Sequence, residues 1–397
     1  MFDIKKEVRE LEAELIALRR KIHEHPELGY HEYETSKLVT EYLEKLGLED
    51  IQHVTGTGVT AILKGKGDGK TVLLRADMDA LPVTEETGLP FASKNPGVMH
   101  ACGHDSHTAI QLVAAKILAS HRDSFNGQVK FLFQPNEEEA GALNMIDAGV
   151  LEKPHVDGAF AIHLWSPIKS GRIAISSGPI LGTTEEFELE IIGKQGHTST
   201  PHTGRDAILG ACSVVQAVQS LGTREFDPLL PIAIMFGFIN GGKARNVISG
   251  SVKLGGTIRF LFPDEKHNKA KVLDAFERVI KGQCISLGLD YSLKYIPSNP
   301  SLYNDPAMVS IVKESAAETF GRTDNVDDFR SLAGEDFAEF SYRVPSAMTF
   351  IGIADKNKGT DYPHHHEKFD IDEDMMSYAV ELQVRNVLHF LGENESK

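Results

Sequence analysis

The stretch TVLLRADMD at residues 71–79 decides the fold class, because a continuous strand-like run ends there in two aspartates. Similar runs occur at residues 59–65, 129–135 and 158–165. A helical pattern spans about residues 108–120, and the residues GKGDGK at 65–70 are typical of a hairpin turn by composition. Apolar strands separated by helices are typical of a largely parallel sheet covered on both faces. We therefore expect an α/β domain built on a central, mostly parallel sheet.

Polar side chains stand at the point where these runs end. Asp77 and Asp79 follow the first run, Glu137 and Glu138 follow VKFLFQP, and His163 ends GAFAIH. In open α/β sheets, ligands bind beyond the carboxyl ends of the strands. These side chains are therefore expected to converge at one edge of the sheet.

A different pattern begins at Glu185. The residues EEFELEII at 185–192 alternate apolar and charged side chains, as a strand with one solvated face does. The elements expected to follow are a helix near 206–221, strands near 232–239 and 252–260, a helix near 264–281 and a strand near 291–296. This order of strand-helix-strand-strand-helix-strand predicts a ferredoxin-like α+β domain.

The chain beyond Pro300 returns to the earlier pattern. The elements expected there are a helix near residues 306–320, a strand near 346–353 and a helix near 372–391. A discontinuous first domain interrupted by an inserted one is the simplest account. We expect the first domain to comprise residues 1–182 and 297–397, and the inserted domain residues 183–296.

The bulk composition excludes several classes of protein. A chain of 397 residues suggests two domains, and 41% hydrophobic with 25% charged residues is typical of a soluble globular protein. The net charge of -16, without a Lys/Arg-rich patch, argues against a nucleic-acid partner. Leu11, Leu15, Leu18 and Ile22 recur at helical spacing among charges, unlike a signal peptide, and no apolar run is long enough to span a membrane. We therefore expect a cytoplasmic protein without a nucleic-acid or membrane partner.

The three cysteines are too few and too scattered for a disulfide framework. Cys212 lies in an apolar run and Cys284 follows a helical pattern, so we expect both to be buried as small apolar side chains. Cys102 differs, because it lies in MHACGHDSHTA, residues 99–109, among three histidines and an aspartate. This stretch is the first candidate for a functional site.

Cys102 and His104 can face one ion only if the backbone turns between them, which Gly103 permits. A turn with incidental polar residues is a common alternative. A structural zinc site would need a second Cys/His pair, and CxxC is absent from the sequence. A site assembled from distant segments is therefore the stronger interpretation.

Three other segments offer suitable side chains. FLFQPNEEEAG at residues 131–141 is either a solvated loop or a pair of carboxylates, one binding a metal and one deprotonating a water molecule. His163 is either a satisfied core histidine or a ligand, and the triplet His364–His366 in YPHHHEKFD is either a solvated loop or a ligand source. Together the segments offer imidazole, carboxylate and thiolate. This mixture suits zinc or another borderline divalent ion better than calcium or magnesium.

Seven motifs, taken in order, resemble one known family. They are RRKIHEHPELGYHEYET, LLRADMDALPVTEETGLPFAS, MHACGHDSHTA, FLFQPNEEEAG, GKQGHTSTPH, GGTIR and GEDFAEF. They closely resemble the amidohydrolase branch of the metallo-aminoacylase/carboxypeptidase family, which includes hippurate hydrolases, indole-acetyl-amino-acid hydrolases and N-acetyl-diaminopimelate deacetylases. The resemblance covers nearly the whole chain. It implies a zinc-peptidase-like catalytic domain and an inserted lid that also joins subunits.

The resemblance implies a centre of two divalent metal ions, which we expect to be zinc, manganese, cobalt or nickel. The residues that match the family's ligands are Cys102, His104, Glu138, His163 and His365. Within the histidine triplet, His365 matches because it stands four residues before Phe369. Glu137 matches the general base.

Further roles are implied outside the ligand set. Asp79 and Asp105 match supporting positions, with Asp79 orienting a ligand histidine. His197 matches a residue that reaches the substrate carbonyl, commonly across a dimer, and Asn246 and Arg259 match positions associated with the substrate carboxylate. The resemblance also implies a homodimer or homotetramer formed through the lid.

The working hypothesis is hydrolysis of the amide bond of an N-acyl-amino acid whose acyl group is acetyl, benzoyl or similar. A metal-activated water would attack the acyl carbon, with Glu137 as general base. A dipeptidase or carboxypeptidase on the same two-metal centre is the alternative within enzymes. A metal-binding regulatory or storage protein is the alternative outside them, and the presence of Glu137 argues against it.

Overall fold

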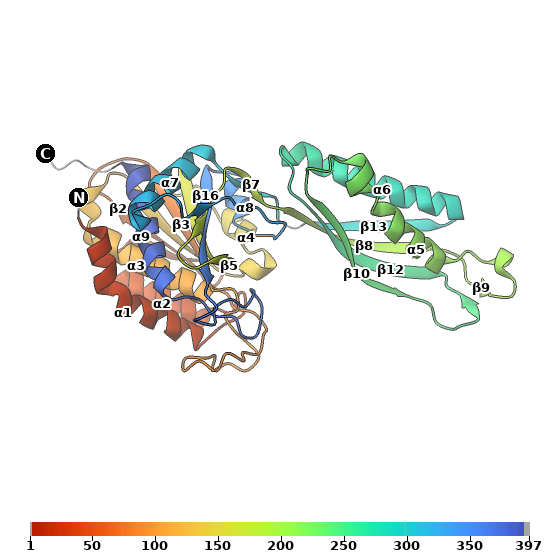
Figure 1. Ribbon diagram of the computed structural model, residues 1–397, viewed down its shortest axis with the longest axis horizontal. Helices are drawn as coiled ribbons and strands as arrows, with labels where there is room; N and C mark the ends of the chain where they lie inside the picture. The colour runs from red at the N-terminus through yellow and green to blue at the C-terminus, as the bar shows by residue number, and fades with distance from the viewer. Residues whose placement is uncertain (1, 298, 393–397) are drawn as a thin grey trace. The chain divides into compact units, whose positions relative to one another are not determined.

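The computed structural model describes residues 2–297 and 299–392 and divides the chain into two compact units (Figure 1). Unit 1 comprises Met1–Gly178, Tyr303–Phe329 and Asp336–Lys397, and unit 2 comprises Pro179–Leu302 and Arg330–Glu335. The second unit thus interrupts the first. Arg330–Glu335 also belong to unit 2, although they lie far along the chain from the rest of it. The sequence pattern does not predict this.

Unit 1 is built on an eight-stranded sheet. Its strands are β1 (Glu49–Val54), β2 (Gly58–Lys64), β3 (Thr71–Asp77), β4 (Gln128–Gln134), β5 (Gly158–Lys169), β6 (Ile173–Ala174), β15 (Val326–Asp327) and β16 (Ser346–Ala354). They lie in the order β1-β2-β4-β3-β5-β16-β6-β15, and β4, β3, β5 and β16 pair in parallel. Strand β3 is buried at every position, as in a sheet covered on both faces. The expected α/β class with a largely parallel sheet is confirmed.

The prediction of a hairpin at GKGDGK, residues 65–70, is wrong. These residues do connect β2 to β3, but β4 lies between the two strands in the sheet. Glycines and charged residues in a short segment indicate that the chain turns there. They do not determine whether the two strands that the turn connects lie next to each other in the sheet.

The helices of unit 1 bring its N- and C-terminal parts together. They are α1 (Ile4–His23), α2 (Tyr33–Lys45), α3 (His104–Ser120), α4 (Ala142–Asp147), α7 (Pro306–Phe320), α8 (Ala338–Ser341) and α9 (Asp374–Leu391). Helices α1, α3 and α9 pack against one another, and α3 and α9 also contact strands of the sheet (Figure 1). Helix α3 is buried along most of its length. Within the described residues, no helix is both long and apolar enough to cross a membrane.

Unit 2 is a four-stranded antiparallel sheet with two helices. Its main elements are β8 (Thr183–Ile192), α5 (Ala207–Val218), β10 (Ile232–Gly241), β12 (Ser251–Phe260), α6 (Glu265–Leu287) and β13 (Asp290–Pro297). The strand order is β10-β12-β8-β13, and α5 and α6 pack beside each other on the sheet (Figure 1). This arrangement confirms the ferredoxin-like α+β fold. A small ladder pairs β9 (Gly196–His197) with β11 (Val247–Ile248), and the short strands β7 (Gly178–Leu181) and β14 (Leu302–Asn304) lie where the chain passes between units.

The cysteines of unit 2 differ from expectation in one case. Cys284 is buried as expected, whereas Cys212 is exposed. Helix α5 buries Ala207, Ala211 and Val214 against the sheet, and Cys212 is one residue away from that stripe. An apolar run in a helix therefore does not bury every small side chain within it.

Candidate metal centre

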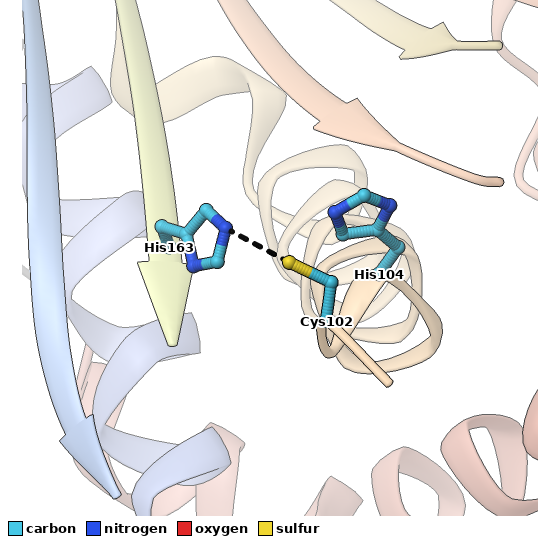
Figure 2. A group of neighbouring side chains, drawn as sticks. All are labelled: Cys102, His104 and His163. Atoms are coloured by element: carbon cyan, nitrogen blue, oxygen red, sulfur yellow. Dashed lines mark hydrogen bonds between the residues drawn. The ribbon is translucent and has the colours of Figure 1, made fainter. Parts of the chain in front are cut away.

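Three of the expected ligands meet beside the middle of β5 and the start of α3, because β5 continues past His163 to Lys169 instead of ending there as the sequence pattern predicts. Cys102 and His104 flank Gly103, whose positive φ of 89° turns the chain into the helix. His163 comes from β5, and its Nε2 lies 3.6 Å from Cys102 Sγ (Figure 2). One ligand atom from each of these residues lies within 4.8 Å of those of the other two.

The main-chain hydrogen bonds of the two histidines occupy Nδ1 and leave Nε2 to face the candidate centre, where His163 Nε2 contacts Cys102 Sγ. His104 Nδ1 lies 2.9 Å from the Asp79 main-chain oxygen, and His163 Nδ1 lies 2.8 Å from that of Leu164. A ring nitrogen facing a carbonyl oxygen donates its hydrogen, so each Nε2 keeps a lone pair for a metal. His104 Nε2 is buried and has no hydrogen-bond partner among the described residues. Burial also lowers the pKa of His163 well below its usual value, which favours the neutral, ligating form.

A second group consists of Cys102, Glu138 and His365. Glu138 lies in the 3-10 turn η2 (Glu137–Glu139) directly after β4, and its main-chain N donates to Asp79 Oδ2 at 3.1 Å. His365 Nε2 lies 3.4 Å from Glu138 Oε1, an atom that is itself buried without a hydrogen-bond partner in the described part of the chain. His365 has a positive φ of 66°, and its main-chain N donates to the Ala101 oxygen at 2.8 Å. These contacts hold the ring beside the Cys102 segment.

Cys102 is shared by the two groups, Cys102–His104–His163 and Cys102–Glu138–His365. Burial, with the neighbouring Glu138 carboxylate adding to it, raises the pKa of the Cys102 thiol well above its usual value. A thiolate at this position therefore needs a nearby positive charge. The unpaired acceptors and the buried thiol fit divalent metal ions, which would supply that charge.

Glu137 lies at the centre but outside these two groups. Its Oε2 is 3.9 Å from His104 Nε2. The preceding Asn136 has a left-handed φ of 56°, and its main-chain N donates to the buried Glu32 carboxylate at 3.0 Å. This anchored turn presents Glu137 beside the ligand atoms, as a general base requires. Glu32 has no signal in the sequence that would identify this role.

His107 is not available as a ligand, although it forms a candidate group with Asp77 and His104. Its Nδ1 lies 2.7 Å from Asp77 Oδ1, and its Nε2 accepts from the Leu164 main-chain N at 2.9 Å. Both ring nitrogens are thus occupied. The side chain fixes β5 next to His163, and Asp77 fixes the tautomer of His107.

The histidine triplet divides by its contacts. His364 places Nε2 3.0 Å from the Leu164 oxygen and Nδ1 3.1 Å from Ser166 Oγ. His366 accepts at Nδ1 from the Lys368 main-chain N. Of the three, His365 is the one whose Nε2 faces Glu138, so the geometry favours His365 as the ligand.

Asp105 is buried next to His104 and pairs with Arg19 and His23 of α1, at 2.9 Å and 2.7 Å. The positive Arg19 and His23 outweigh the cost of burial and lower the pKa of Asp105. The residue is therefore a charged anchor for the start of α3. Arg19 and His23 lie in the motif RRKIH, whose helical spacing by itself indicates no role for either side chain.

The expected substrate residues lie in unit 2 and do not all come together within it. His197 is exposed on β9, and the adjacent Thr198 main-chain N donates to the Asn246 oxygen, which places these two segments side by side. Arg259 of β12 is the strand-register partner of Thr184, at the start of β8. His197 lies on β9, which follows the end of β8. The Arg259 guanidinium Nη1 donates to the Leu332 oxygen at 3.0 Å. His197, in the separate β9–β11 ladder, and Arg259, in the four-stranded sheet, therefore lie beyond opposite ends of β8.

Comparison with known proteins gives consistent matches over most of the chain. A model of peptidase family M20/M25/M40 matches residues 73–388. The chain is 40% identical to thermostable carboxypeptidase 1 of Saccharolobus solfataricus, over 94% of each chain. It is 42% identical to an N-acyl-L-amino acid amidohydrolase of Geobacillus stearothermophilus, over 74% of this chain and 78% of the relative. The crystal structure of a Bacillus subtilis protein, described as a dinuclear metal binding peptidase from M20 family, matches with a TM-score of 0.83 and 32% identity, covering 96% of this chain and 99% of that one.

Proposed function

Because this chain belongs to peptidase family M20/M25/M40, we propose that it hydrolyses the amide bond of N-acyl-amino acids at a two-metal centre. The family match confirms the resemblance inferred from the sequence motifs. One observation supports the proposal above all others: two groups of ligand atoms share Cys102, and Glu137 stands beside them.

The two groups give the ligand assignment. Cys102, His104 and His163 would hold one ion, and Cys102, Glu138 and His365 the other, so Cys102 belongs to both sets. Divalent ions bound here would lower the pKa of water and polarise the substrate carbonyl. The mixed donor set is compatible with zinc, manganese, cobalt or nickel.

Glu137 performs the proton transfers in this proposal. Its carboxylate would take a proton from the attacking water and return it to the leaving amine, so one residue serves both steps. The main-chain anchor between Asn136 and Glu32 keeps the carboxylate in place between these steps. His197 of unit 2 would donate to the oxygen on which negative charge develops.

We also propose a homodimer formed through unit 2. Strand β10 is an edge strand that pairs with β12, and it exposes Met235, Phe238 and Ile239. A long apolar edge strand is a template for pairing with another chain. A second copy would also supply a His197 to a substrate near Arg259, because within one chain Arg259 lies beside the start of β8 and His197 lies in the β9–β11 ladder that follows the end of β8. The homotetramer, and a cytoplasmic location without nucleic-acid or membrane partners, stay predictions.

Replacing Ile239 by Lys is expected to shift the protein from dimer to monomer in light scattering, because the charge would be buried in the paired edge. Ile285→Lys is the matched control, since Ile285 is also exposed but lies on α6, which packs by β13 at the other edge. A monomeric wild-type protein would contradict the proposal.

A carboxypeptidase activity on the same centre is the second candidate, because two relatives are named carboxypeptidases. A panel of N-acetyl amino acids, hippurate and dipeptides, assayed with zinc, manganese, cobalt and nickel, separates the two. We expect the highest kcat/KM on an N-acyl-amino acid. Preferential cleavage of dipeptides would transfer the assignment to the peptidases, and inactivity on every substrate with every metal would favour a binding protein.

A further inference from the structure

The motif RRKIH at residues 19–23 places two buried side chains beside the ligand segments. Arg19 and His23 are 1% and 0% exposed on α1, one helical turn apart, and therefore on the same face. Both contact Asp105 Oδ2, the carboxylate that directly follows His104. Neither residue is among the proposed ligands or takes part in the proposed proton transfers.

Arg19 also contacts the segment that follows His365. Its Nη2 lies 2.7 Å from Asp370 Oδ1 and its Nη1 lies 2.9 Å from Glu373 Oε1. The Nε to Asp105 contact measures 2.9 Å. The planar guanidinium thus joins the start of α3 to the loop that bears His365.

His23 makes a second, indirect connection of the same kind. Its Nδ1 lies 2.7 Å from Asp105, and its Nε2 lies 3.4 Å from Glu85. The next residue, Glu86, donates its main-chain N to the Glu367 oxygen at 2.8 Å. Arg19 therefore connects the His104 segment to the loop of residues 363–370 directly, and His23 connects it through the Glu85–Glu86 segment.

We infer that Arg19 and His23 are positioning residues that hold His365 in register with Cys102 and His104. The inference rests on the ligand set of the proposed function. The inference concerns mainly the ion proposed to bind Cys102, Glu138 and His365. The other group, Cys102–His104–His163, is already buried and oriented by main-chain oxygens.

His365 depends most on such support. Its side chain is 53% exposed, and its backbone adopts a left-handed conformation. An exposed ligand on a loop loses conformational entropy when it binds a metal, unless the fold has already fixed the loop. Partners that orient metal ligands typically contribute about 10- to 100-fold in metal affinity.

The test uses Asp370→Ala, which removes the Arg19 contact nearest to His365 in the sequence. It leaves the Arg19–Glu373 contact in place and keeps Asp105 paired with both Arg19 and His23. Arg385→Ala is the matched control. It removes a half-buried arginine of α9 that pairs with Glu381 and Glu318, so it alters a comparable ion pair away from the ligand segments. Arg19→Lys is the second variant, because an ammonium group keeps the charge but lacks the planar fork.

Zinc affinity is measured by competition with a chromophoric chelator, with thermal unfolding recorded in parallel. In Asp370→Ala and Arg19→Lys we expect one zinc ion to stay tightly bound and the second to bind about 10- to 100-fold more weakly. Wild type and Arg385→Ala should both hold two ions tightly.

Unchanged affinity for the second ion in Asp370→Ala would overturn the inference and leave the proposed function in place. Equal weakening in Asp370→Ala and Arg385→Ala would also overturn it, because general destabilisation would then account for both. A wild-type protein that binds no zinc would instead overturn the proposed centre, and the inference with it.

Discussion

Glu137→Gln is expected to lower kcat by about 10²- to 10⁴-fold while both metal ions stay bound. The amide has nearly the shape of the carboxylate but cannot accept the proton of the attacking water. Glu137 also lies close enough to His104 and Glu138 to form a ligand group with them, but the proposed assignment uses only the two groups that share Cys102, so metal content should not change. Steady-state kinetics on the best panel substrate, together with metal analysis of the same sample, measures both effects.

Glu139→Gln is the matched control, since Glu139 is the exposed third member of the same glutamate triplet. It should retain wild-type kcat. Wild-type turnover in Glu137→Gln with metal retained would remove Glu137 from the mechanism, and a loss of turnover in Glu139→Gln alone would make Glu139 the base instead.

Cys102→Ala is expected to weaken the binding of both metal ions, because Cys102 belongs to both ligand groups. His365→Ala should weaken the binding of only one ion, because His365 belongs to only one of the two groups. Metal bound per chain after dialysis against a weak chelator distinguishes the two variants. Binding must also release the thiol proton, so zinc affinity should fall as the pH is lowered.

Cys284→Ala is the control for loss of a buried thiol, because Cys284 lies in unit 2, whereas the proposed ligand residues all belong to unit 1. It should keep both ions. If Cys102→Ala kept both ions as tightly as wild type, a thiolate shared between the metals would be excluded.

Much of the fold follows from apolar runs and their ends. The runs at β3 and β4 are short and continuous, and parallel strands place their carboxyl ends at one edge, although β5 continues past His163 to Lys169. The positions of Glu138 and His163 at the ends of such runs are enough to predict that the two side chains lie near each other. The runs do not predict the strand order, because β2 and β3 are adjacent in sequence yet separated by β4.

The remaining features depend on contacts between distant segments. The family resemblance selects His365 by its spacing from Phe369, but the physical reason for preferring it to His364 is that Leu164 and Ser166 already occupy both ring nitrogens of His364. Arg19 looks like a solvated residue in the helical pattern of α1, whereas its burial depends on three carboxylates brought from α3 and the loop before α9. Periodicity in one segment cannot reveal a partner supplied by another.

The most direct test of the two-metal centre is a zinc titration of the metal-free protein, with hydrolysis and bound zinc per chain measured at each step. The shared Cys102 predicts that activity reaches its plateau only when two zinc ions are bound per chain. Full activity at one zinc ion per chain would contradict the account.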